Sequence, residues 1–131
     1  MIAATTMSSI EGRENVEWRE LKYGEVLKAV ESGDNSAKIK LAWLKLSGLG
    51  GAEIDEDGAV VLLEERVKDR DGDAMWMLGV CYEFGMGTEQ DIKRADELYY
   101  QSYGKGNEIG NFFVWNVKKE RGSGKMKMYS L

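Results

Sequence analysis

Apolar residues recur every three or four positions along most of this chain, and short stretches of Gly, Asn, Asp and Ser separate the runs. This spacing is typical of helices that bury one face. We expect a first helix from Trp18 to Glu31, which the turn around Gly33 ends, and a second from Ser36 to Leu46. A third should begin at Asp55 or Asp57, because a carboxylate there can accept hydrogen bonds from the free amides of a helix start.

The same pattern then starts again further along the chain. Six positions in the first copy have counterparts 37 residues later. The first copy has Ala37, Leu41, Ala42, Lys45, Gly48 and Gly50, and the second has Ala74, Leu78, Gly79, Tyr82, Gly85 and Gly87. Asp91 and Ala95 follow Asp55 and Ala59 one position closer, because the intervening loop is a residue shorter, and a third start is visible at Gly110, Val114 and Trp115. Self-similarity with this period indicates helix pairs that stack on their neighbours.

One stretch of the chain carries the repeat in full: Ala74-x-x-x-Leu78-Gly79-x-x-Tyr82-x-x-Gly85-x-Gly87, then Asp91-x-x-x-Ala95-x-x-Leu98-Tyr99-x-x-Ser102-Tyr103-x-x-Gly106-Asn107. It resembles a Sel1-like repeat, which is related to the tetratricopeptide repeat. Lys45 and Lys118 stand where that family prefers an aromatic residue, and Arg70 stands where it has Gly. The resemblance implies an all-α, right-handed superhelix of antiparallel helix pairs that serves as an adaptor and has no catalytic activity.

We expect one domain, because 131 residues suffice for a single core but not for two. Residues 1–14 read as a disordered leader, since they are small, polar and aperiodic. The domain then comprises a partial repeat at 15–35, full repeats at 36–72 and 73–108, and a partial repeat or cap at 109–131.

Composition narrows the range of functions. The chain has no histidine and one cysteine, Cys81, so it lacks the usual general base and the ligands of a cysteine–histidine zinc site. We therefore expect no enzyme activity and no cofactor. The net charge of −5 argues against nucleic-acid binding, which needs a basic face. No signal peptide or long apolar run is present, so we expect a cytoplasmic protein without a membrane span.

A second apolar line runs along the first helix of each repeat, on the face opposite the motif residues. In tetratricopeptide-like superhelices this face is concave and binds peptides, so we expect a groove that holds a protein or peptide partner. Its residues would be Ile39, Trp43, Leu46, Trp76, Val80, Glu83, Phe84 and Phe112. Two alternatives remain open: these side chains belong to the core, or the chain associates with itself, as a homodimer for example, through the open ends of the array.

The acidic segment 53–64 offers another site. It resembles a calcium-binding EF-hand loop, with acids at its first, third and fifth positions, Gly58 at the sixth and an acid at the twelfth. The calcium ligands would be Glu53, Asp55, Asp57 and Glu64. The competing interpretation is that these acids simply start the third helix, where the helix dipole favours them.

Overall fold

The structure is a computed structural model that describes residues 20–121. This part of the chain is all-helical, without a strand, and contains six helices. They are α2 (Tyr23–Glu31), α3 (Ala37–Ser47), α4 (Glu56–Lys68), α5 (Gly72–Phe84), α6 (Ile92–Gly104) and α7 (Glu108–Arg121). The predicted all-α class is therefore confirmed for residues 20–121.

Most helices begin and end close to the positions that the sequence predicts. The exception is the start of α2: Lys22 is extended, with φ −112° and ψ 130°, so Leu21 and Lys22, which the prediction placed in the first helix, lie before it. Asp55 and Asp91 are the N-caps of α4 and α6, and each accepts a hydrogen bond from the N–H three residues later. Gly48, directly after α3, adopts a left-handed conformation with φ 73°. Three predicted features lie outside the described residues: the leader at 1–14, the predicted helix start at Trp18, and residues 122–131 of the partial repeat or cap at 109–131.

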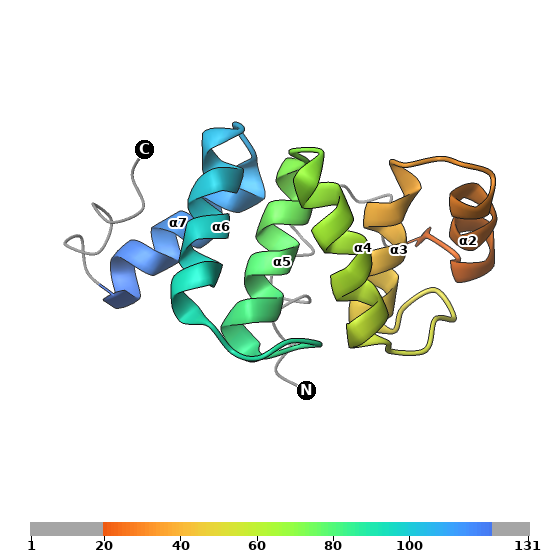
Figure 1. Ribbon diagram of the computed structural model, residues 1–131, viewed down its shortest axis with the longest axis horizontal. Coiled ribbons are helices and arrows are strands. Elements are labelled where there is room, and N and C mark those ends of the chain that lie inside the picture. Colours follow the sequence, from red (N-terminus) through yellow and green to blue (C-terminus); the bar gives the residue numbers. More distant parts are fainter. Residues whose placement is uncertain (1–19, 122–131) are drawn as a thin grey trace.

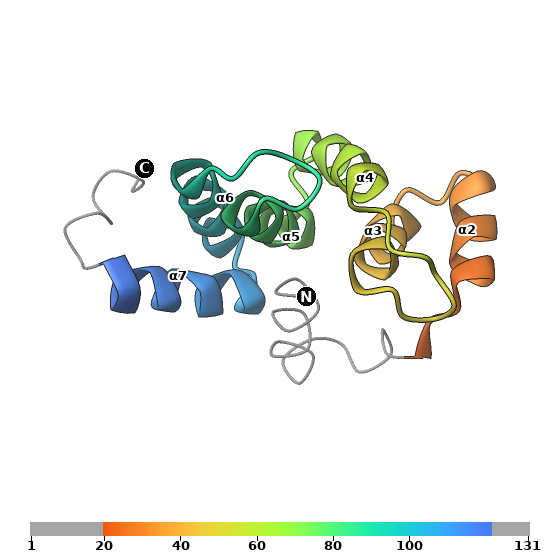
Figure 2. The same cartoon turned by 90° about the horizontal axis from the view of Figure 1, so that it is seen from below.

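Each helix packs against the helix that follows it, and α5 also contacts α7 and α3. The helices lie side by side along the long axis of the molecule, with α2 and α7 at opposite ends of the described part (Figure 1). Seen from below, α7 runs past α5 and α6 at one end (Figure 2). The centre of the array is α5, whose residues 74–81 are all buried.

The hydrophobic core is aromatic around α5, α6 and α7. Phe113 of α7 stacks on Tyr99 of α6 with ring centroids 4.5 Å apart, and on Trp76 of α5 at 5.7 Å. All three side chains are buried, with exposed fractions between 0 and 5%. These contacts fix which side of α7 faces the rest of the protein.

The turns that precede α3, α5 and α7 share one backbone feature. Gly33, Arg70 and Gly106 have φ values of 98°, 62° and 77°. Arg70 is the only non-glycine residue among the described ones with positive φ. A Cβ opposes this left-handed conformation, so Arg70 holds a backbone geometry that suits Gly better.

Candidate functional site

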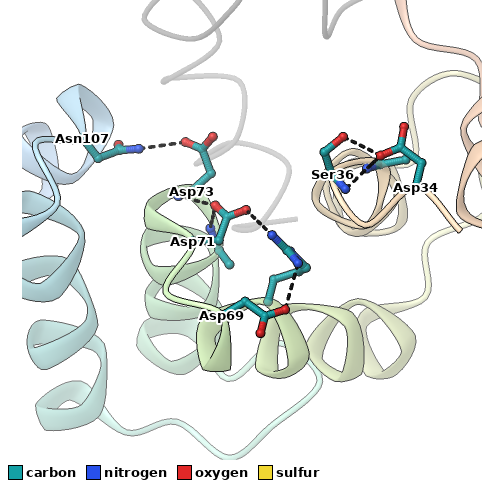
Figure 3. Close-up of polar contacts among 9 residues, drawn as sticks. Asp34, Ser36, Asp69, Asp71, Asp73 and Asn107 are labelled. Atoms are coloured by element: carbon teal, nitrogen blue, oxygen red, sulfur yellow. Dashed lines mark hydrogen bonds and ion pairs between the residues drawn. The ribbon is translucent and has the colours of Figure 1, made fainter.

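The segments that lead into α3, α5 and α7 share one side-chain contact, which gives the three helices a common reference position. In each, an Asp or Asn oxygen accepts the backbone N–H three residues later. The pairs are Asp34 with Ala37 at 3.3 Å, Asp71 with Ala74 at 3.2 Å and Asn107 with Gly110 at 2.9 Å. Figure 3 shows the three capping side chains, and Asn107 also donates from its amide to Asp73, 2.9 Å away. Equivalent positions of α3, α5 and α7 can therefore be compared by counting from the cap.

The eighth residue after the cap distinguishes α7 from the other two helices. In α3 this residue is Ala42, which is fully buried. In α5 it is Gly79, and a Cβ added there would lie 2.5 Å from the Tyr99 ring of α6. In α7 it is Trp115, which is 55% exposed. In α5 this position is small enough for α6 to pack closely against it, whereas in α7 the equivalent position carries a large, exposed aromatic side chain.

Trp115 belongs to one exposed face of α7. The opposite face holds the buried residues Ile109, Phe113, Val114 and Val117. The exposed residues Glu108, Asn111, Trp115 and Lys118 are three or four positions apart, so they form a line along the helix. We call these four residues the α7 face. Lys119 lies beside it, with its Nζ 5.1 Å from the centre of the Trp115 ring.

The predicted groove is not an exposed surface in this structure. Five of its residues are 0 to 3% exposed and belong to the hydrophobic core: Ile39, Trp43, Leu46, Trp76 and Val80. Trp76 shows one physical reason, because it stacks on Phe113 and donates from its indole N–H to Asp73, 3.1 Å away. The alternative that the side chains of the second apolar line belong to the core accounts for these five residues.

The other three predicted groove residues are half-buried. Glu83 accepts a hydrogen bond from the Tyr99 hydroxyl at 2.6 Å, so its carboxylate ties α5 to α6. Phe112 packs edge-on against Phe113, with ring centroids 5.4 Å apart, and Phe84 packs against the core. Only the rim of the predicted groove is therefore in reach of solvent.

The structure does not bring the four predicted calcium ligands together. Asp55 caps α4, accepting from the Gly58 N–H at 2.9 Å, and forms an ion pair with Lys45 at 3.1 Å. Glu64 accepts a hydrogen bond from the Tyr82 hydroxyl at 3.0 Å. Among residues 20–121 no three His, Cys, Asp or Glu side chains are placed to share a metal ion. Asp55 and Asp57 stand at the start of α4, whereas Glu64 lies inside the helix.

A polar pocket of about 470 Å³ lies at the other end of the array, between α2, the end of α3 and the loop before α4. Its lining consists of Tyr23, Lys45, Gly51, Glu53, Ile54 and Asp55. The Lys45 ammonium is shared between the Asp55 carboxylate and the Tyr23 ring, 5.9 Å from its centroid. The Lys45 and Asp55 charges in the pocket lining are therefore engaged with each other.

Cys81 is fully buried in α5. Burial raises the pKa of its thiol to about 12, and the charges of Glu56 and Glu64 add to this effect. The thiol is consequently protonated near neutral pH and is a poor nucleophile.

None of the helices between residues 20 and 121 combines the length and apolar character that a membrane-crossing helix needs. Comparisons with protein-family models, curated proteins and solved structures give no match to this chain.

Proposed function

We propose that this chain is a non-catalytic protein-binding module built from Sel1-like helix pairs, and that its binding surface is the α7 face. In this proposal the pairs α3–α4 and α5–α6 are two repeats of a right-handed superhelix. The helix α2 is the second half of a preceding repeat, and α7 is the first half of a following one.

The repeat part of the proposal is supported by contacts that recur at one spacing. The caps Asp34, Asp71 and Asn107 lie 37 and 36 positions apart and make equivalent hydrogen bonds. The N–H groups of Asp55 and Asp91 donate to Lys45 and Tyr82, which again are 37 positions apart. Recurrent backbone contacts of this kind are expected when one supersecondary unit is repeated.

The binding part rests on one observation, the exposure of Trp115 at a helix position where α3 and α5 carry small buried residues. Tryptophan anchors are enriched among the residues that dominate protein interfaces. Covering the exposed half of such a ring is worth about 2 kcal/mol at 25 cal/mol per Å². The polar residues of the α7 face, Glu108, Asn111 and Lys118, would form the rim that such an anchor needs.

The test compares the proteins that are captured by the wild type and by a Trp115→Ala variant from a lysate of the source cell. The matched control is Val61→Ala, which removes an apolar side chain that is 68% exposed on α4. We expect specific proteins that are retained by the wild type and by Val61→Ala but lost by Trp115→Ala, while all three melt at similar temperatures. If Trp115→Ala retains every captured protein, the α7 face is not the binding surface.

A further inference from the structure

The four residues of the α7 face are arranged symmetrically about their own midpoint. Successive residues are three, four and three positions apart, and the middle of the set lies between Asn111 and Trp115. The two end residues carry opposite charges: the acidic Glu108 stands in the first turn of the helix, and the basic Lys118 stands in its last part. A surface with this order of residues is complementary to itself when it is turned by 180°.

We infer that a second copy of this chain binds the α7 face, with the two α7 helices antiparallel across a two-fold axis. Such an axis, passing between Asn111 and Trp115, places Glu108 of each copy opposite Lys118 of the other. It also places each Trp115 opposite Asn111 of the other copy, where the indole N–H can donate to the amide oxygen. A two-fold interface of this type requires that the same patch complement itself, and the α7 face meets this requirement in both charge and spacing.

The contact should be weak and dependent on concentration. One face of a single helix buries less than the roughly 1,200 Å² that stable interfaces bury, even though this face includes the large Trp115 side chain. Exposed ion pairs are also screened by salt, so association should weaken as ionic strength rises. The dimer should therefore form at high protein concentration and low salt.

This inference rests on the proposed function in one respect, because it assigns the partner of the same face. Its test uses the full chain and two single charge reversals, Glu108→Lys and Lys118→Glu. Each reversal alone places like charges opposite each other at both ends of the symmetric contact, and it should weaken self-association by about tenfold or more. Mixing the two variants restores an opposite-charge pair at both ends, so the mixture should associate as a heterodimer.

Sedimentation velocity over a wide concentration range measures this directly for the wild type, each variant and their equimolar mixture. We expect dimers in the wild type and in the mixture, and mainly monomers in each variant alone. A wild type that stays monomeric at the highest concentration, or dimers that are unaffected by the charge reversals, would overturn the inference. The proposed function can fail separately, because it depends on proteins captured through Trp115 and not on the mass of the purified chain.

Discussion

Gly79 of α5 lies so close to Tyr99 of α6 that a Cβ at Gly79 would be 2.5 Å from Cε1 of the ring. The Ala95 carbonyl oxygen lies on the same side, 3.2 Å from that Cβ position. Tyr99 cannot move aside freely, because it stacks on Phe113 and donates to Glu83. We therefore predict that Gly79→Ala lowers the free energy of unfolding by about 1–3 kcal/mol, as overpacked core substitutions do. Urea-induced unfolding measures the change.

The control for this prediction is Gly24→Ala in α2. No atom lies within 4 Å of a Cβ at Gly24, so the substitution meets open space. Because Ala favours the helix over Gly by about 1 kcal/mol, Gly24→Ala should leave stability unchanged or raise it. Equal effects of the two substitutions would contradict the close packing of α6 on Gly79.

Arg70 offers a position where a substitution should stabilise the protein. Its φ is 62°, whereas Gly33 and Gly106 occupy the equivalent places in the other two turns. A left-handed conformation costs a residue with a Cβ about 1–2 kcal/mol. Replacing it by Gly removes this cost, but part of the gain is offset because Gly loses more conformational entropy on folding. We predict that Arg70→Gly raises the free energy of unfolding by about 0.5–1 kcal/mol. Lys68→Gly, two residues earlier in α4, should lower it, and the two thermal midpoints provide the comparison.

The thiol of Cys81 should react only when the protein opens. Because the side chain is fully buried and its pKa is raised to about 12, little thiolate is accessible at pH 8. We predict that a disulfide reagent labels the native protein slower than the urea-unfolded protein by a factor on the order of 10³. A Cys81→Ala/Glu89→Cys variant, with its thiol on an exposed loop, should react at similar rates in both states. Rapid labelling of native Cys81 would show that α5 is not buried as described.

Acid should destabilise the protein through its capping carboxylates. The Gly58 N–H, and after it Lys45, hold the pKa of Asp55 below its ordinary value of 3.8, and the Ser36 hydroxyl does the same for Asp34. A carboxyl with a lowered folded pKa contributes stability above its unfolded pKa, and this contribution is lost as the pH falls through the folded value. We predict that the melting temperature falls as the pH drops below about 4.

A substitution at Asp55 tests the cause of this acid dependence. Asp55→Asn removes the titrating group, so its melting temperature should change less between pH 7 and pH 3 than that of the wild type. Asp57→Asn removes the same charge two residues further along and controls for the change in net charge. If both variants follow the wild type, the cap at Asp55 does not contribute to the acid dependence.

The helices could be predicted from the sequence because their signals are local. The 3.6-residue periodicity, the acids at Asp55 and Asp91 and the glycines at Gly33 and Gly48 act within a few residues of each helix end, and the structure places helix boundaries there. The sequence also marked Arg70 as a departure, because it stands where the Sel1-like pattern has Gly, and the structure gives it a positive φ of 62°.

The exposure of the candidate site could not be predicted in the same way. Periodicity identifies residues that share a helix face, but whether that face is covered depends on how distant helices cross. Trp43 and Trp76 share a predicted exposed line and are fully buried, whereas Trp115 stands at a motif position and is exposed. A signal for Trp115 was present in the sequence. At the eighth position after the cap, α3 and α5 carry the small residues Ala42 and Gly79, whereas α7 carries a Trp.

The most direct test of the α7 face as a binding surface is to replace Trp115 by the photo-crosslinking residue p-benzoylphenylalanine and to identify by mass spectrometry what it captures. The same residue at Val61 serves as the control for an exposed site on α4. The account predicts specific intermolecular crosslinks from position 115, either to a second copy of this chain or to another protein, that exceed those from position 61. Equal or no crosslinking from the two positions would contradict the claim that the α7 face binds protein.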